Sequence, residues 1–287
     1  MEVFTTRDEL RNWLATREGR RRILVPTMGA LHAGHTSLFQ LAVSEAGKDG
    51  DVLASIFVNP TQFGPGEDFD AYPRKLESDL AECRDHGVTA VFAPPPEEIY
   101  LPDASINITE SNLSKHLCGA SRPGHFDGVC LVVAKLFHIT QPSAAVFGEK
   151  DFQQLAIIRR LVRDLDFPIE IIGGSTVRES DGLALSSRNA YLSSRDRNEA
   201  PLIHAALSEA SQLIASGEME EAEQALTYMR SKLEEAPHAV IDYLAVVDEE
   251  TLEPIENLKE GTPRLLAAVF FGKTRLIDNV GVPENSD

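Results

Sequence analysis

The sequence has few cysteines, no long apolar run and too few basic residues to balance its acidic ones, and each scarcity excludes a class of protein. Its three cysteines, Cys83, Cys118 and Cys130, are widely spaced and form no CxxC pair, so we expect free thiols in a reducing cytosol. No apolar stretch approaches the roughly 20 residues of a membrane span, and residues 1–10 show no signal-peptide pattern. We therefore expect a cytoplasmic protein without a membrane partner.

Positive charge is scarce, because 27 Lys and Arg residues stand against 45 Asp and Glu residues, for a formal net charge of -18. Such a chain repels a nucleic-acid backbone, so we expect no nucleic-acid partner. An acidic enzyme that binds an anionic nucleotide must gather its few cations locally. Lysines and arginines near glycines are therefore the first candidates for a site.

Several common catalytic motifs are also missing. The chain contains neither a G-x-G-x-x-G dinucleotide fingerprint nor a G-x-S-x-G nucleophile elbow. Gly272-Lys273-Thr274 imitates the end of a P-loop, but Ala267 stands where the first glycine is needed and an apolar, strand-like run precedes it. The usual phosphate-binding loops are therefore absent from the sequence.

Up to about residue 172 the pattern is that of an α/β protein. Short β-branched runs alternate with helical stretches, as in βαβ units that build a parallel sheet. The expected strands, each short and mostly apolar, are 23–27, 52–58, 88–92, 144–147 and 169–172. A helix is expected to follow the first strand, and another is predicted by the 3.6-residue spacing of Leu155, Ile158, Leu161, Val162 and Leu165.

Beyond about residue 178 the pattern changes. A long loop is followed by helical segments around 197–216 and 218–235 and by apolar runs at 240–247 and 265–271. These indicate a small α+β domain. A chain of 287 residues is long enough for two domains of about 150 residues, and we predict them over residues 1–176 and 177–287.

The segment PTMGALHAGH, residues 26–35, follows the first strand and opens a helix. A helix N-terminus offers unpaired N–H groups and partial positive charge, glycines allow close approach, and His32 and His35 are spaced i, i+3 on one side. This pattern favours a phosphate site. In the alternative interpretation, one histidine caps the helix and the other lies in the core. A metal-binding pair is disfavoured because no third ligand follows as in HExxH.

The segment FGEKDFQQ, residues 147–154, repeats this strand-to-helix arrangement. In a parallel sheet both turns fall at the carboxyl ends of their strands, where ligands bind at the point of strand-order reversal. We therefore expect Lys150 to reach the same phosphates as the histidines. Taken alone, Glu149-Lys150-Asp151 is equally typical of a solvated helix N-cap.

A polar loop, TVRESDGLALSSRN at residues 176–189, lies at the expected domain boundary. Ser186, Ser187 and Arg188 suit a mobile phosphate clamp, because hydroxyls donate hydrogen bonds and arginine offers bidentate contacts. Closure of such a lid would exclude water from ATP. The alternative is an ordinary interdomain linker.

Two further polar segments, FVNPTQFG at 57–64 and SRPGHFDG at 121–128, flank apolar runs that we interpret as strands. Amide side chains suit the hydroxyls and carboxylates of a small polar substrate, although each is also common in turns and as a strand-end cap. The residues expected to bind substrate are Asn59, Gln62, Arg122, His125 and Gln154.

Together these segments resemble the pantothenate synthetase family, within the HxGH nucleotidylyltransferase superfamily that is related to class I aminoacyl-tRNA synthetases. The resemblance rests on PTMGALHAGH, FVNPTQFG, DAYPR, RPGHFDGV, FGEKDFQQ and TVRESDGLALSSRN, in this order over nearly the whole chain. Departures from the family pattern are few: Ala33 stands for a glutamate, Ser78 for an often acidic residue, Phe152 for a tyrosine and Leu185 for a methionine.

The resemblance implies a Rossmann-like domain, a smaller C-terminal lid domain and a homodimer. It also implies that ATP, with Mg2+, converts pantoate into a pantoyl-adenylate that then reacts with β-alanine. His35 is the implied proton donor, with His32, Lys150 and Arg188 as the other catalytic residues. Gln62 and Gln154 are implied to hold pantoate, and Asp79 to lie near the metal. The ATP-site residues implied are Met28, Gly29, Ala30, Leu31, His32, Ala33, Gly34, His35, Gly148, Glu149, Lys150, Asp151, Val177, Leu185, Ser186, Ser187 and Arg188.

Two alternatives of other kinds remain open at the level of sequence. One is an HxGH adenylyltransferase with a phosphate acceptor, and the other is a nucleotide-binding module without turnover. Pantoate is already a carboxylate at neutral pH, so its adenylation requires alignment and charge stabilisation rather than a general base. Analysis of the products formed from ATP, pantoate and β-alanine distinguishes the three functions.

Overall fold

The computed structural model describes residues 1–64, 66–67 and 69–283, so the last four residues of the predicted C-terminal domain lie outside it. The chain forms two compact units. The N-terminal unit comprises Met1–Ser114, Gly119–Glu149 and Ile157–Ser175, and the C-terminal unit comprises Lys115–Cys118, Lys150–Ala156 and Thr176–Asp287. Two short segments that precede the predicted boundary therefore cluster with the C-terminal unit.

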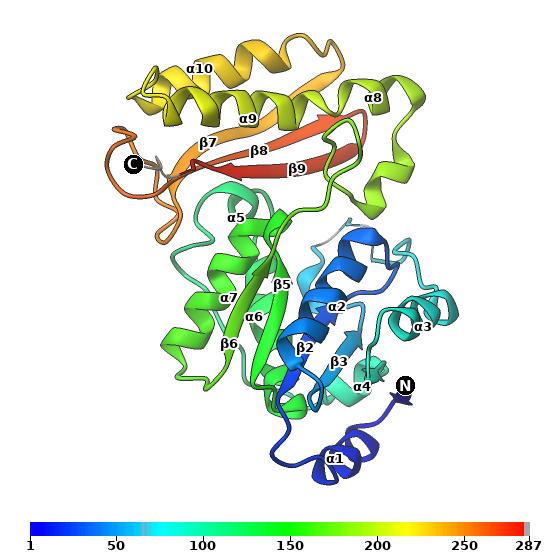
Figure 1. The fold of residues 1–287 in the computed structure, drawn as a ribbon. Helices are drawn as coiled ribbons and strands as arrows, with labels where there is room; N and C mark the ends of the chain where they lie inside the picture. Colours follow the sequence, from blue (N-terminus) through cyan, green and yellow to red (C-terminus); the bar gives the residue numbers. More distant parts are fainter. Residues whose placement is uncertain (65, 68, 284–287) are drawn as a thin grey trace. The chain divides into compact units, whose positions relative to one another are not determined.

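A six-stranded parallel sheet forms the centre of the N-terminal unit (Figure 1). Its strands are β1 (Glu2–Phe4), β2 (Arg22–Thr27), β3 (Asp51–Ile56), β4 (Ala90–Phe92), β5 (Ala144–Gly148) and β6 (Glu170–Gly174), in the order β1-β4-β3-β2-β5-β6. From β2 the chain adds β3 and β4 on one side and then returns to add β5 on the other. The strand order thus reverses between β2 and β5, where parallel sheets bind ligands at the carboxyl ends of their strands.

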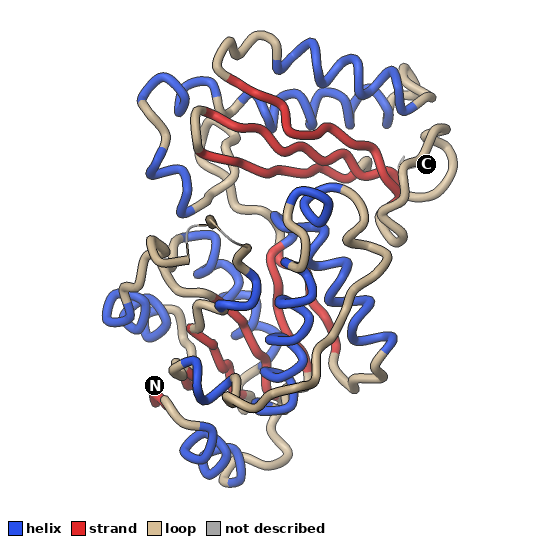
Figure 2. The backbone as a smooth tube through the Cα atoms, turned by 180° about the vertical axis from the view of Figure 1, so that it is seen from behind, coloured by secondary structure: helices blue, strands red, loops and turns tan. Residues whose placement is uncertain are grey.

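Helices cover both faces of this sheet (Figures 1 and 2). The helices in this part of the chain are α1 (Arg7–Ala15), α2 (Ala33–Ala46), α3 (Leu76–Asp85), α4 (Pro96–Ile99), α5 (Leu117–Ser121), α6 (His125–Thr140) and α7 (Phe152–Asp164). Helix α2 packs Phe39 and Ala42 against Ile23, Val52 and Val146 of the strands. The predicted α/β class with a parallel sheet is confirmed.

The apolar run after residue 128 is a helix and not a strand, which corrects our interpretation. Helix α6 has 16 residues and buries most of them, including Val129, Val132 and Val133. A continuous apolar run does not by itself distinguish a buried strand from a buried helix. Leu165, expected on the buried face of a helix, instead follows the end of α7 and is 51% exposed.

The C-terminal unit has an antiparallel sheet in the order β7-β8-β9. Its strands are β7 (Ala239–Asp248), β8 (Pro263–Phe271) and β9 (Thr274–Gly281), and its helices are α8 (Ser194–Glu199), α9 (Leu202–Ala215) and α10 (Ala222–Leu233). Leu207 and Met229 pack with Leu265 and Val269 in its core. The predicted α+β character is confirmed, although β9 was not expected. Among the described residues, no helix has the length and apolar character to cross a membrane.

Candidate active site

The loop after β2 turns the chain from the sheet into α2 through two residues in the left-handed region. Gly29 has φ +80° and Ala30 has φ 52°. The Thr27 hydroxyl accepts the N–H of Gly29 at 3.3 Å and donates to the Ser55 carbonyl of β3 at 2.8 Å. The end of β2 thereby fixes the start of the loop.

His32 is the N-cap of α2, and His35 lies in its first turn. The His32 Nδ1 accepts the N–H of Gly34 at 3.1 Å, and the His35 Nδ1 accepts the N–H of His32 at 3.3 Å. Because both Nδ1 atoms are acceptors, each neutral ring carries its proton on Nε2. The two rings, whose centroids lie 4.2 Å apart, therefore each have an Nε2–H donor.

Several main-chain N–H groups of the expected phosphate cradle bind protein acceptors. The N–H groups of five residues bind protein acceptors: Gly29 binds Thr27, Ala30 and Leu31 bind Asp79, His32 binds His35, and Gly34 binds His32. The helix-capping alternative is right for His32, whereas His35 is half-buried rather than a core residue. The imidazoles add side-chain N–H groups to this loop.

Asp79, the residue expected near a metal, lies in the first turn of α3 and is only 2% exposed. Its Oδ2 accepts the N–H of Ala30 at 3.0 Å and its Oδ1 accepts the N–H of Leu31 at 2.8 Å. Within the part of the chain that the structure describes, no three His, Cys, Asp or Glu side chains are grouped to hold a metal. The residues around Asp79 therefore do not fit a protein-built Mg2+ site.

Gln62 follows β3 in the short 3-10 helix η1 (Pro60–Gln62), and its amide has a fixed orientation. The Thr61 N–H donates to Asn59 Oδ1 at 3.3 Å, so Asn59 directs its Nδ2 to the Gly128 carbonyl and to Gln62 Oε1, both at 3.1 Å. The Gln62 Nε2 then lies 2.9 Å from Met28 Sδ. Gln62 thus turns its N–H groups, and not its oxygen, away from Asn59.

Asn59, which the sequence predicted as a substrate contact, is held by a dense set of hydrogen bonds to the protein. It is 1% exposed, and its oxygen also accepts the Tyr100 hydroxyl at 2.7 Å and the Thr61 hydroxyl at 2.9 Å. Both polar groups of its side chain therefore bind protein. Sequence reasoning missed Tyr100, which is 41 residues from Asn59 and belongs to none of the motifs.

Arg122 and His125, also predicted as substrate contacts, both bind the main-chain carbonyl of Gln62. The His125 Nδ1 lies 2.7 Å from the Gln62 carbonyl, so Nδ1 must donate, and the Nε2 then accepts from Arg122 Nη1 at 3.1 Å. Arg122 also pairs with Glu67, and this hydrogen bond lowers the pKa of the Glu67 carboxyl. The network holds the main chain of Gln62.

Helix α6 and η1 are in close contact at Gly128. A β-carbon at Gly128 would lie 2.3 Å from the Thr61 carbonyl oxygen and 2.8 Å from the Gln62 nitrogen. No side chain fits between α6 and this peptide. The absence of a side chain at Gly128 therefore helps to set the position of Gln62.

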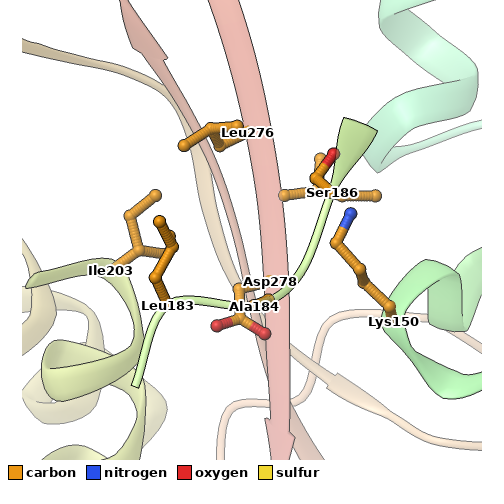
Figure 3. Close-up of a pocket in the computed structure, with 8 residues that line it drawn as sticks. Lys150, Leu183, Ala184, Ser186, Ile203, Leu276 and Asp278 are labelled. Carbon is orange, nitrogen blue, oxygen red and sulfur yellow. The ribbon is translucent and has the colours of Figure 1, made fainter. Parts of the chain in front are cut away.

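In the C-terminal unit, Lys150 lines a small pocket with Ser186, Ala184 and Asp278 (Figure 3). The remaining lining is apolar and consists of Leu183, Ile203, Leu276 and Ile277. Burial lowers the pKa of Lys150, while Asp151 and Asp278 raise it and Arg188 lowers it further. The charged form of Lys150 is thus opposed by burial and favoured by the neighbouring carboxylates.

The main chain at Lys150 is held by strand β9. The Asn279 Nδ2 donates to the Lys150 carbonyl at 3.0 Å, and Asn279 Oδ1 accepts from Arg264. The Arg264 guanidinium lies 3.7 Å from the centroid of the Phe152 ring. These supporting residues were missed because β9 was not predicted.

The loop that carries Ser186 and Arg188 is a small hairpin anchored by ion pairs. Leu185 donates its N–H to the Val177 carbonyl at 2.9 Å, and Arg178 binds both Asp278 oxygens at 2.6 and 3.0 Å. Ser186 accepts the N–H of Arg188 at 3.2 Å. The hairpin is thus held by its own hydrogen bonds and by the ion pair to β9.

The predicted site residues divide between the two units. The N-terminal unit contains Met28–His35, Gln62, Gly148 and Glu149, and the C-terminal unit contains Lys150, Asp151, Gln154, Val177 and Leu185–Arg188. Gln154 lies in the first turn of α7, is half-buried and donates its N–H to Asp151 Oδ1 at 3.3 Å. Each unit thus contains cationic or imidazole donors and one of the two glutamines.

Known proteins resemble this chain over nearly its whole length. It is 50% identical to the pantothenate synthetase of Akkermansia muciniphila, with 98% of this chain and 99% of that protein covered. It is also 50% identical to the pantothenate synthetase of Moorella thermoacetica, with 99% and 100% covered. The sequence likeness therefore includes both units.

Two solved structures share the fold. The pantothenate synthetase of Thermus thermophilus is 45% identical, has a TM-score of 0.91 and covers 98% of this chain and 99% of its own. A pantoate-beta-alanine ligase from Francisella tularensis, described as complexed with beta-gamma ATP and beta-alanine, is 32% identical with a TM-score of 0.77 over 98% and 97% of the chains. A family model described as pantoate-beta-alanine ligase matches residues 2–281. The chain therefore belongs to the pantoate-beta-alanine ligase family.

Proposed function

We propose that this protein condenses (R)-pantoate with β-alanine, using ATP, to give pantothenate, AMP and diphosphate through a pantoyl-adenylate. The observation that carries this proposal is the pair of imidazoles at the start of α2, whose Nδ1 atoms accept main-chain N–H groups and leave Nε2–H as the donor of each ring. Such donors suit the phosphates of ATP at the switch point of a parallel sheet. Membership of the family supports the same function.

In the first step, a carboxylate oxygen of pantoate attacks the α-phosphorus of ATP and diphosphate leaves. No general base is needed, so the protein contributes alignment and charge stabilisation. His32 and His35 donate to the phosphates, with His35 as the proton donor, and Lys150 and Arg188 neutralise developing negative charge. The other residues that the sequence predicts for ATP also bind the nucleotide.

Pantoate is held by Gln62 and Gln154. Gln62 offers N–H groups because its oxygen accepts from Asn59, which suits a carboxylate or hydroxyl oxygen of the substrate. Asn59, Arg122 and His125, predicted as direct contacts, act on pantoate through Gln62. Gln62 and Gln154 thus contact pantoate, and the other three predicted residues position Gln62.

In the second step, the amine of β-alanine attacks the acyl carbon of the adenylate, a C–N bond forms and AMP leaves. An alkylammonium has a pKa of about 10, so the amine must lose a proton before it attacks. The ammonium group of β-alanine carries three protons. The amide nitrogen keeps one of them, and solvent receives the other two. The phosphate charge on AMP is again stabilised by the imidazole and lysine donors.

A metal ion, a lid domain and a dimeric assembly complete the proposed function. Mg2+ would accompany ATP as part of the substrate and would supply positive charge that balances the phosphates. The C-terminal unit acts as the lid domain, the protein forms a homodimer, and it works in the cytoplasm.

The experiment that tests the function is product analysis with the purified protein. ATP, pantoate and β-alanine are supplied together and then omitted one at a time. We expect AMP and pantothenate only with all three, and diphosphate with ATP and pantoate alone. A stable dinucleotide-like product would indicate an adenylyltransferase with a phosphate acceptor, and binding without products would indicate a nucleotide-binding module.

A further inference from the structure

The carboxylate of Asp79 binds two successive main-chain N–H groups in the loop that leads to the histidines. Its Oδ2 accepts from Ala30 and its Oδ1 from Leu31, at 3.0 and 2.8 Å. Two adjacent N–H groups that converge on one anion form a concave anion site of the kind that often binds phosphate. In this structure the occupant is a carboxylate of the same chain.

The conformation of the loop explains why such an anchor is required. Ala30 has φ 52°, a left-handed value that is unfavourable for a residue with a side chain. Gly29 precedes it with φ +80°, and a β-carbon there would lie 2.8 Å from Asp79 Oδ2. The carboxylate can approach the turn this closely because residue 29 is a glycine. Its hydrogen bond to the Ala30 N–H stabilises the unfavourable conformation of Ala30.

The anchored turn is adjacent to the histidine pair. Leu31, whose N–H binds Asp79, directly precedes His32, whose own N–H binds the His35 ring. A shift of this turn moves the N-cap of α2 and changes both Nδ1 contacts. The directions of the two Nε2–H donors thus depend on Asp79.

We propose that Asp79 is a positioning residue that holds the Ala30–Leu31 turn, and with it His32 and His35, and that it is not a metal ligand. This inference rests on the proposed function. Both Asp79 oxygens point at N–H donors, whereas Mg2+ demands near-ideal octahedral geometry around oxygen ligands. The position next to Asp79, where a second carboxylate could bind a metal, is occupied by Ser78, which is exposed and has no carboxylate.

The test compares Asp79→Asn with Glu77→Gln. Asparagine keeps the shape of the side chain but turns its NH2 group toward one of the two N–H donors, so one hydrogen bond is replaced by a contact between donors. Glu77 lies in the same helical turn, is exposed and is the matched control for loss of a negative charge.

We expect Asp79→Asn to lower kcat for pantoyl-adenylate formation by about 100-fold, the effect of a small misplacement of aligned groups. The Mg2+ concentration that gives half-maximal activity stays unchanged. In 1H–15N spectra, the amide protons of Ala30 and Leu31 move upfield, and the remaining spectrum shows a folded protein. Glu77→Gln changes none of these measurements.

Two outcomes would overturn the proposal. Activity of Asp79→Asn that is restored by raising Mg2+ would make Asp79 a metal ligand, and unchanged amide shifts of Ala30 and Leu31 would show that the carboxylate does not hold the turn. Asp79→Glu gives a second comparison, because its longer carboxylate keeps the charge but displaces the turn, so we expect it to remain impaired at every Mg2+ concentration. The amide shifts need no turnover, so failure of this inference is distinguishable from failure of the proposed function.

Discussion

The hydroxyl of Tyr100 donates a hydrogen bond of 2.7 Å to Asn59 Oδ1, and this contact helps to fix which side of the Gln62 amide is available to a ligand. Asn59 cannot rotate its amide without placing NH2 against the Thr61 N–H. Gln62 in turn cannot rotate while Asn59 donates to its oxygen. Under the proposed function, the Tyr100 hydroxyl therefore contributes to pantoate binding through Asn59 and Gln62.

Replacement of this hydroxyl tests the relay. We expect Tyr100→Phe to raise the KM for pantoate by about 3- to 10-fold, since one hydrogen bond contributes about 0.5–1.5 kcal/mol, with a smaller change in kcat. Steady-state kinetics with pantoate as the varied substrate measure the effect. Tyr228→Phe is the control because it removes a 2.6 Å bond to Glu209 in the C-terminal unit. Equal KM values for Tyr100→Phe and the wild type would contradict the relay.

Removal of the second imidazole tests the catalytic role of the histidine pair. We expect His35→Ala to keep the fold but to lose about 3–4 kcal/mol of transition-state stabilisation, the usual effect of removing one donor from a closed site. Single-turnover formation of pantoyl-adenylate measures this loss. His238→Ala, at an exposed position, should leave the rate unchanged. Wild-type adenylation by His35→Ala would exclude the proposed role.

Lys150 gives the adenylation step an expected dependence on pH. Burial places its pKa below the ordinary value, so its positive charge is lost as pH rises through that lowered pKa. The single-turnover rate of adenylation should therefore fall on the alkaline side. Asp278→Asn removes a carboxylate that raises the Lys150 pKa, so the alkaline fall should move to lower pH. A shift in the opposite direction would show that Asp278 does not support this cation.

Gly128→Ala tests the close contact between α6 and the segment that carries Gln62. A helical Gly→Ala change normally favours folding by about 1 kcal/mol. Here the new methyl group meets the Thr61 carbonyl, and overpacking costs about 1–3 kcal/mol, so we expect net destabilisation and a raised KM for pantoate.

Gly64→Ala is the matched control for this change. Gly64 lies in the polar segment that carries Gln62, and a β-carbon there would have no described neighbour nearer than 3.8 Å. Thermal unfolding and pantoate kinetics measured on both variants separate the effect of the contact from that of an added methyl group. A Gly128→Ala protein as stable as Gly64→Ala would show that α6 adjusts to the extra carbon.

Local patterns predicted the parts of the fold and site that depend on neighbours in sequence. The Gly29–His35 segment directly follows an apolar strand, so the start of α2 was recognisable. Strand β9 was missed because Arg275, Asp278 and Asn279 interrupt its apolar pattern. Those polar side chains bind partners in other elements, and the sequence contains no signal for such contacts.

The supporting residues of the site were unpredictable for the same reason. Asp79 lies 48 positions from Leu31, and Asn279 lies 129 positions from the carbonyl of Lys150 that it binds. Only the fold brings these groups together. Asn59 was found by its place in a polar segment, but its role required knowledge of Tyr100 and Gly128.

The fixed amide of Gln62 has a consequence for ligand selection. A ligand that reaches Gln62 meets N–H groups, and the group it displaces is the sulfur of Met28, a weak acceptor. Compounds with an oxygen acceptor at this point match the amide, whereas an isosteric compound with an amine or ammonium there places donor against donor. The Tyr100–Asn59 pair thus makes hydrogen-bond polarity, in addition to shape, a criterion for inhibitors directed at this part of the site.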